Sequence, residues 1–280
     1  MLPSPTRPHL WLVPLLLLAA CERGVDRTTP APPTTTTTEA PTTSTTTTST
    51  TTTVVPTTSP TTTSPPTTIS GAPARVVSRG DPGRRTVALT FDAGADVGFA
   101  AQILDTLERS AVASTFGITG RWAEAHPDLV RRMGDAGHLI MNHSYEHRSF
   151  TGVSAGPALL STAERLNDLE RADNAIRAVT GHSTRPWFRS PYGDYDASLS
   201  AVLGSLGYRY NVLWTVDSLG WQGLSPGAIT SRCLGGVVPG AILLFHVGAQ
   251  SQDSAALPAI IAGLRQAGYG FGTVADLIGG

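Results

Sequence analysis

The stretch TVALTFDAGAD, residues 86–96, contains the pattern that decides the fold. Residues 86–91 are mostly apolar or β-branched, which predicts a buried strand ending just before Asp92. Residues 98–110 follow with apolar side chains at helical spacing. The same succession recurs, with strands expected at 113–118, 138–141, 186–188, 208–216, 241–245 and 269–274, and helices at 127–136, 157–179, 197–206, 225–234 and 254–267. Repeated strand-then-helix units predict a parallel α/β fold, as an open sheet or a barrel.

Five of the predicted strands end at a side chain that can carry acid–base or ionic chemistry. These residues are Asp92, His143, Arg189, Asp217 and His246. In a β/α barrel the carboxyl ends of the strands converge on one mouth, where active sites lie. Core packing does not account for five such residues, so we expect them to form a catalytic site.

Two smaller patterns suggest what this site binds. His143 and His147 are four residues apart, so one helical turn would place both on one face, within reach of a single metal ion. Trp214 and Trp221 flank Asp217, and aromatic faces beside a carboxylate suit stacking on a sugar ring. For Trp214, packing in the core explains the residue equally well.

The first part of the sequence indicates export. Residues 10–20 form a short apolar run behind Arg7, which is about half the length of a ~20-residue membrane span and predicts a signal peptide over residues 1–20. The run ends in Leu-Ala-Ala before Cys21 and resembles a bacterial lipobox. We therefore expect lipidation of Cys21 and attachment to the outer face of the cell membrane. The alternative is a plain secretory signal and a secreted protein.

Residues 28–68 are almost entirely Thr, Pro and Ser and lack the apolar side chains that would offset the entropy of ordering. We expect a disordered linker over 21–79 and one folded domain over 80–280. Acidic and basic residues number 21 and 20, for a net charge of −1, which argues against a nucleic-acid partner. Cys233 is expected to be a small buried residue, and the domain a monomer.

In their order and spacing, these motifs resemble those of the polysaccharide deacetylase family, the carbohydrate esterases of family 4 built on the NodB homology domain. The resemblance covers residues 84–278. Residues 143–147 match the family motif H-S/T-x-x-H, residues 189–192 match R-x-P-Y, and residues 244–246 match L-x-H. Residues 90–94 are similar to T-F-D-D-G, and residues 217–221 are similar to D-x-x-D-W. Each motif is weak alone, but the ordered set is specific.

The resemblance implies a distorted (β/α)7 barrel that hydrolyses the N-acetyl amide of an amino sugar. A divalent metal, zinc first and cobalt or nickel as alternatives, would be held by His143 and His147. Asp92 would be the base that takes a proton from water, with Arg189 keeping it charged. His246 would be the acid that protonates the departing amine.

Three further residues receive roles from the same resemblance. The backbone N–H of Tyr192 would help to hold the oxyanion. Trp221 and Asp217 would lie on the substrate side of the site.

The chain departs from the family motifs at two positions. Ala93 stands where the first motif has an Asp that ligates the metal. Asp96 could supply this oxygen instead, the two histidines and water could hold the metal, or Asp92 could lean onto it. If the site is empty, the protein is a carbohydrate-binding module without activity. Gly220 stands where the fourth motif has an Asp that supports the acid and the base, and Asp217 is its candidate replacement.

The expected location narrows the substrate. A barrel tethered outside the membrane on a long linker meets peptidoglycan first, so cell-wall glycan is the expected substrate. A chitin-like, capsular or biofilm polymer is the second candidate. Chemically competent side chains at so many strand ends favour an enzyme over a structural stalk protein.

Overall fold

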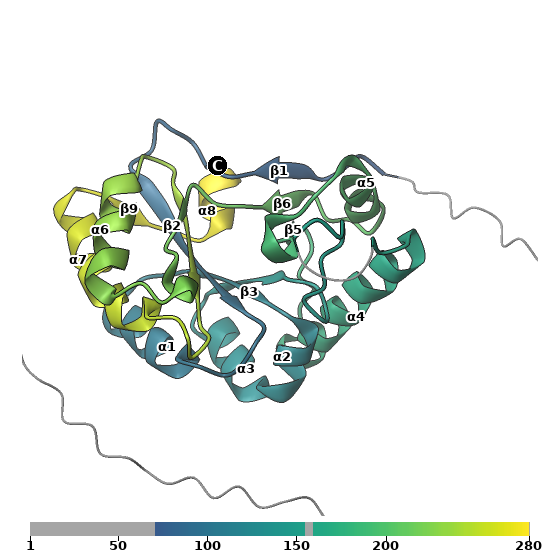
Figure 1. Ribbon diagram of the computed structural model, residues 1–280, viewed down its shortest axis with the longest axis horizontal. Coiled ribbons are helices and arrows are strands. Elements are labelled where there is room, and N and C mark those ends of the chain that lie inside the picture. The colour runs from purple at the N-terminus through teal and green to yellow at the C-terminus, as the bar shows by residue number, and fades with distance from the viewer. Residues whose placement is uncertain (1–70, 155–158, 280) are drawn as a thin grey trace, which may run out of the picture. The chain divides into compact units, whose positions relative to one another are not determined.

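The structure, a computed structural model, describes residues 71–154 and 159–279 (Figure 1). The expected signal peptide, Cys21 and most of the expected linker lie outside the described residues. Among the helices that are described, none combines the length and apolar character needed to cross a bilayer.

A curled parallel sheet forms the centre of the described region. Its order is β1-β6-β5-β4-β3-β2-β8-β7, and β9 pairs with β2. All the pairings between these strands are parallel, which confirms the predicted α/β class. The strands are β1 Arg75–Val77, β2 Thr86–Ala93, β3 Thr115–Ile118, β4 Leu139–Asn142, β5 Trp187–Phe188, β6 Tyr210–Val212, β7 Val216–Asp217, β8 Ile242–His246 and β9 Gly270–Phe271.

Helices surround this sheet, with α1 to α3 along one side, α6 and α7 at one end and α4 and α5 at the other (Figure 1). They are α1 Ala100–Arg109, α2 Gly120–Ala125, α3 Pro127–Asp135, α4 Thr162–Thr180, α5 Ala197–Ser205, α6 Pro226–Gly236, α7 Asp253–Gln266 and α8 Val274–Ile278. Two short 3-10 turns, Pro191–Gly193 and Gly220–Gln222, follow β5 and β7. The short helices α2 and α8 were not predicted from the sequence.

Helix α4 begins later than the expected residue 157. Ser161 is its N-cap and forms a capping box with Glu164, so the four free N–H groups of the first turn begin there. At the other end Gly181 adopts φ 77°, a left-handed conformation that terminates the helix. The apolar stripe that suggested an earlier start includes Leu159 and Leu160, which precede the cap.

An aromatic row across three strands fixes the register at the site. Phe91 pairs in register with Phe116 of β3 and Phe245 of β8, and its ring stacks on theirs at 5.2 and 5.3 Å between centroids. Such aromatic pairs contribute about 0.5–1.5 kcal/mol beyond the area they bury. Because side chains alternate along a strand, the next residue, Asp92, faces the opposite side of the sheet, in register with His246.

The expected single strand over 208–216 is wrong, because residues 213–215 cross between the two ends of the sheet. β6 pairs with β1 and β5, whereas β7 pairs with β8. Leu213 N–H donates to Val77 O and Thr215 N–H donates to Ile242 O, each at 2.8 Å. This crossing brings the two edges of the sheet together without a continuous strand pairing, so the barrel is distorted and incompletely closed.

The expected boundary of the folded domain at residue 80 is too late. Residues 75–77 form β1, which extends the sheet beside β6 with Arg75 opposite Tyr210. Ala74 and Val77 are buried in this layer. The segment just before residue 80 therefore belongs to the fold and not to the linker.

Candidate active site

Asp92 lies at the end of β2 and is the centre of the site. Its Oδ1 accepts a hydrogen bond from Arg189 Nη1 at 2.8 Å, and its Oδ2 is 3.5 Å from His143 Nε2. Burial of the carboxyl opposes ionisation, but the positive charge of Arg189 and its hydrogen bond to the carboxylate outweigh it, so the pKa of Asp92 is below its usual value. Asp92 is therefore an ionised carboxylate in a buried place, as its predicted role as a base requires.

Arg189 is completely buried, and its guanidinium is held on several sides. Besides Asp92, it donates from Nε to Val212 O and from Nη2 to Thr90 Oγ1, each at 2.9 Å. Thr90 Oγ1 in turn donates to Leu243 O at 2.8 Å. Because each of its three nitrogens donates to a fixed acceptor, the buried guanidinium is held in one orientation and positions the Asp92 carboxylate.

The two histidines of the HSYEH segment converge. The Nε2 atoms of His143 and His147 are 3.1 Å apart, and His143 Nδ1 is 2.9 Å from Arg189 O. A proton on Nδ1 of His143 satisfies that carbonyl and leaves the lone pair of Nε2 directed into the site. Burial lowers the pKa of His143, and it lowers that of His147 to about 3, so both rings are neutral, as metal ligands must be.

This convergence does not arise from a helical turn, and that part of the prediction is wrong. The segment is a loop in which Ser144 and His147 have positive φ, 70° and 58°. Asn142 Oδ1 accepts from Ser144 N–H at 2.8 Å, and Ser144 Oγ accepts from His147 N–H at 2.9 Å. These local bonds hold a backbone conformation that non-glycine residues rarely adopt.

Asp168 of α4 anchors the same loop and was missed in the sequence. Its Oδ1 accepts from Tyr145 N–H at 2.7 Å and its Oδ2 from Glu146 N–H at 3.4 Å. Asp168 shares the buried face of α4 with Arg165 and Asp173, so its place in the sequence does not reveal its partner.

The structure does not bring Asp96 together with the histidines. Its Oδ1 accepts from Ala249 N–H at 2.9 Å, and its carbonyl oxygen accepts from Trp122 Nε1 at 2.9 Å. Within residues 71–154 and 159–279 no group of three or more His, Cys, Asp or Glu side chains is placed to hold a metal ion. Asp96 therefore lines the rim of the site, while its carboxylate fastens one loop to another.

Tyr192 and Trp221 present exposed aromatic rings at the mouth, with exposed fractions of 48% and 50%. The Tyr192 ring meets that of His147 edge-on, with centroids 4.7 Å apart, and Trp221 lies 6.5 Å from the ring of His246. Asp217 accepts from Leu219 N–H at 2.9 Å and from Trp221 Nε1 at 3.4 Å. Asp217 thus shapes the Trp221 loop, and these bonds occupy the carboxylate proposed to replace the missing Asp at Gly220.

His246 ends β8, and its nearest carboxylate is another residue that was missed in the sequence. The backbone N–H of His246 donates to Asp253 Oδ2 at 2.8 Å, and His246 Nδ1 is 4.0 Å from the same oxygen. Asp253 begins α7 and is fully buried. Asp253 lies outside the family motifs and at no strand end, which are the two criteria that identified the other site residues in the sequence.

Two adjoining hollows of about 380 and 540 Å³ open over this group of residues. Five residues line both of them: Asp92, His143, His147, Trp221 and His246. Together the hollows form a polar-floored cleft with aromatic walls, a shape that suits a sugar ring.

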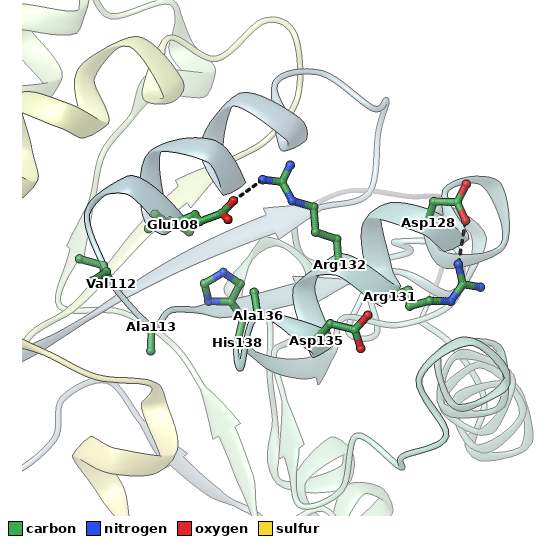
Figure 2. A pocket seen from close by; sticks show the side chains of 11 residues that line it. Glu108, Val112, Ala113, Asp128, Arg131, Arg132, Asp135, Ala136 and His138 are labelled. Carbon is green, nitrogen blue, oxygen red and sulfur yellow. Dashed lines mark hydrogen bonds and ion pairs between the residues drawn. The ribbon is translucent and has the colours of Figure 1, made fainter.

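A further hollow of about 590 Å³ lies at the opposite ends of the strands. Its lining includes Ala113 and His138, which precede β3 and β4, and four of its charged side chains form two ion pairs (Figure 2). Arg132 meets Glu108 at 2.9 Å, and Arg131 meets Asp128 at 2.8 Å. This end of a β/α barrel serves stability, so the hollow is not a candidate site.

Comparisons with known proteins agree with this geometry. The sequence model of the family described as polysaccharide deacetylase matches residues 79–211. A peptidoglycan-N-acetylglucosamine deacetylase of Bacillus cereus is 32% identical over 194 residues, which are 68% of this chain and 67% of the relative. The peptidoglycan-N-acetylmuramic acid deacetylase PdaA of Bacillus subtilis is 31% identical over 204 residues, 71% of this chain and 73% of the relative.

Among solved structures, a carbohydrate esterase family 4 pseudoenzyme from Bacillus anthracis superposes with a TM-score of 0.66 at 28% identity, covering 74% of this chain and 69% of that one. A mutant of that pseudoenzyme with restored enzymatic activity superposes equally well, at 29% identity. Identity above 30% over two thirds of curated relatives, together with the shared fold, shows that this chain belongs to the polysaccharide deacetylase family, carbohydrate esterase family 4.

Proposed function

We propose that the protein is a metal-dependent polysaccharide deacetylase that hydrolyses N-acetyl groups of amino sugars, with peptidoglycan as its first substrate. One observation carries the proposal: an Asp92 carboxylate kept ionised by buried Arg189 lies beside two converging imidazoles and opposite His246. The named activities of the Bacillus cereus and Bacillus subtilis relatives support the choice of peptidoglycan.

The donor set fits a divalent cation, but with an open ligand position. His143 and His147 offer two neutral nitrogens that point at one place, and Ala93 adds no donor. Zinc binds imidazole nitrogen well, and cobalt or nickel would bind the same donors. When bound, the ion would supply Lewis-acid polarisation of the acetyl carbonyl and lower the pKa of a nearby water.

The residues of the chain would carry the proton transfers. Asp92 accepts a proton as the oxygen of water bonds to the acetyl carbon, and Arg189 keeps the carboxylate oriented throughout. The C–N bond then breaks while His246 donates a proton to the leaving nitrogen, because an amide anion is a very poor leaving group. The products are acetate and the free amine of the sugar.

The remaining site residues would bind the substrate. The backbone N–H of Tyr192, in the turn after β5, would stabilise the oxyanion. The exposed ring of Trp221, held by Asp217, would stack on a sugar ring beside the cleft.

A second candidate function is a carbohydrate-binding module without activity. The lack of a third protein ligand among the residues that the structure describes, marked by Ala93, favours it, as does the likeness to a pseudoenzyme of the same family. Against it, Asp92 and Arg189 form a buried ion pair beside His143, with His246 in register with Asp92, an arrangement that binding alone does not need.

The location belongs to the same proposal. Lipidated Cys21 would anchor the protein to the outer face of the membrane, with the Thr/Pro-rich linker giving the domain its reach into the cell wall. If the lipobox is not used, the protein is secreted. The expectations of a monomer and of no nucleic-acid partner remain predictions.

Acetate release tests the proposal. The purified protein is supplied with zinc, cobalt or nickel and given peptidoglycan fragments or chitooligosaccharides, beside Asp92→Asn and His143→Ala. Release by the wild type alone, abolished by a chelator, supports the deacetylase. Tight glycan binding with metal bound and no acetate released would identify the binding module instead.

A further inference from the structure

The space left by Gly220 is filled by another carboxylate. A side chain begun at Gly220 would place its Cβ 2.7 Å from Asp253 Cγ and 2.5 Å from Ser251 Oγ. Real Cβ atoms do not approach other atoms so closely, so Asp253 occupies the volume that an Asp at position 220 would need. The φ angle of Gly220 is one that other residues also adopt, so the backbone does not require glycine here. Glycine is required because Asp253 and Ser251 leave no room for a side chain.

Asp253 reaches this place from the start of α7, after the loop that follows β8. It is fully buried, its Oδ2 accepts the backbone N–H of His246 at 2.8 Å, and its own backbone N–H donates to Ser251 Oγ at 3.3 Å. The carboxylate is therefore tied to the strand end that carries the expected acid.

Two polar atoms in this contact lack partners. Within the described part of the chain, neither His246 Nδ1 nor Asp253 Oδ1 has a hydrogen-bond partner, although both are buried. His246 Nδ1 lies 4.0 Å from Asp253 Oδ2. Unsatisfied buried polar groups cost free energy, and a small rotation of either side chain would pair an Nδ1–H donor with a carboxylate acceptor.

Other groups that face His246 are already engaged. Asp92 of β2 binds Arg189, and Asp217 of β7 binds Leu219 N–H and Trp221 Nε1. The histidines His143 and His147 from the loop after β4 offer no negative charge. Asp253 is thus the carboxylate near His246 that still has an oxygen, Oδ1, without a partner among the described residues.

We propose that Asp253 is the positioning residue of His246, replacing the carboxylate that the fourth motif lacks at Gly220. It accepts Nδ1–H and so turns the Nε2–H of His246 toward the leaving nitrogen. The carboxylate comes from the start of a helix and not from the loop after β7, and Gly220 makes room for it. This role rests on the proposed deacetylase function.

Leaving-group dependence tests this role. A sugar amine must be protonated as it leaves, whereas 4-nitrophenolate leaves without a proton, so a defect in acid delivery affects N-acetyl hydrolysis far more than hydrolysis of 4-nitrophenyl acetate. Asp253→Asn keeps an oxygen for the His246 backbone N–H but loses the charge. We expect it to lower the ratio of amide to ester kcat by about 100-fold.

Relocation of the carboxylate provides a second test. Gly220→Asp alone crowds Asp253 and lowers amide turnover, whereas Gly220→Asp combined with Asp253→Ala returns a carboxylate to His246 and recovers amide turnover relative to Asp253→Ala. Asp92→Asn is the matched control and lowers both amide and ester rates, because it removes the base. An unchanged amide-to-ester ratio in Asp253→Asn would overturn the proposal.

A readout without turnover separates this inference from the proposed function. In the wild type, the Nδ1–H proton of His246 should give a downfield, slowly exchanging NMR signal, assigned by its loss in His246→Gln and absent in Asp253→Ala. If the wild type releases no acetate but this signal depends on Asp253, the deacetylase proposal fails. The hydrogen bond between His246 Nδ1–H and Asp253 is then still supported. If the signal persists in Asp253→Ala, the positioning role is wrong.

Discussion

The Asp92 carboxylate and the Arg189 guanidinium form a buried ion pair, with Oδ1 and Nη1 2.8 Å apart and almost no exposure of either side chain. Arg189 also spans three strands, because it bonds to Thr90 of β2 and Val212 of β6 from its own position after β5. The pair is thus both the charged centre of the cleft and a tie across the sheet.

Arg189→Met should therefore damage stability and activity together. Removing one partner of a buried ion pair leaves an uncompensated charge and costs about 3–5 kcal/mol. Denaturant unfolding of the variant checks this value. Arg131→Met is the control, since it breaks an exposed pair with Asp128 at a similar distance of 2.8 Å and should leave the free energy of unfolding nearly unchanged. An equal loss of unfolding free energy in the two variants would contradict the claim that burial makes the Asp92–Arg189 pair more important for stability than the exposed pair.

The ionisation of Asp92 predicts a particular pH dependence of stability. Because its folded-state pKa is depressed, the group contributes stability that is present above the unfolded value of about 3.9 and is lost as the pH falls through the lower folded value. The gap in Tm between wild type and Asp92→Asn should be constant near neutral pH and should narrow below about pH 4. Thermal unfolding across this pH range measures the difference in Tm. A difference that widens on acidification would show that the pKa of Asp92 is not lowered in the folded protein.

Ala93 predicts weak metal binding that one substitution can strengthen. Ala93→Asp restores a carboxylate where the family's first motif has a metal ligand, and should tighten zinc binding by about tenfold or more, equivalent to about 1.4 kcal/mol. Titration calorimetry of the metal-free protein measures this directly. Asp96→Ala is the informative companion, because the Asp96 carboxylate binds Ala249 N–H and should not contribute to affinity. A loss of affinity in Asp96→Ala would restore Asp96 as a ligand.

The strand-end residues were predictable because two simple regularities coincide. Alternation along β2 turns Phe91 into the core and Asp92 away from it, and parallel pairing places the ends of neighbouring strands together. Asp92, Arg189 and His246 therefore met as expected, and Cys233 is buried as expected. These features depend on periodicity, which a single sequence shows directly.

Features that depend on close tertiary approach were not predictable in the same way. The convergence of His143 and His147 follows from positive φ at Ser144, which no residue preference indicates. The split of residues 208–216 follows from the meeting of two sheet edges, because no Gly or Pro in this segment marks a break in the strand. Asp253 acquires its place from the absence of a side chain at Gly220, so the signal lies in a pair of residues far apart in the chain.

Asp168 of helix α4 anchors the loop of residues 143–147, called the histidine loop below. We therefore expect a substitution of Asp168 to weaken metal binding, although Asp168 is not itself a metal ligand. Asp168→Asn keeps one acceptor oxygen and loses the other, so one of the bonds to Tyr145 N–H and Glu146 N–H weakens. A loop with positive φ at Ser144 and His147 needs those bonds to hold the two Nε2 atoms 3.1 Å apart. Because outer-shell partners typically contribute 10–100-fold to metal affinity, we expect a loss of about tenfold in zinc binding.

Asp173→Asn on the same helix is the matched control. Asp173 accepts from Thr184 N–H at 2.7 Å and from Ser183 Oγ at 2.9 Å, so it anchors the turn before β5 and not the histidine loop. Its substitution should lower the free energy of unfolding and leave zinc affinity nearly unchanged. If Asp173→Asn weakens zinc binding as much as Asp168→Asn does, the effect reflects a general loosening of α4 and the anchoring role of Asp168 is wrong. If only Asp168→Asn weakens it, the geometry of the metal ligands depends on a helix that contributes no ligand of its own.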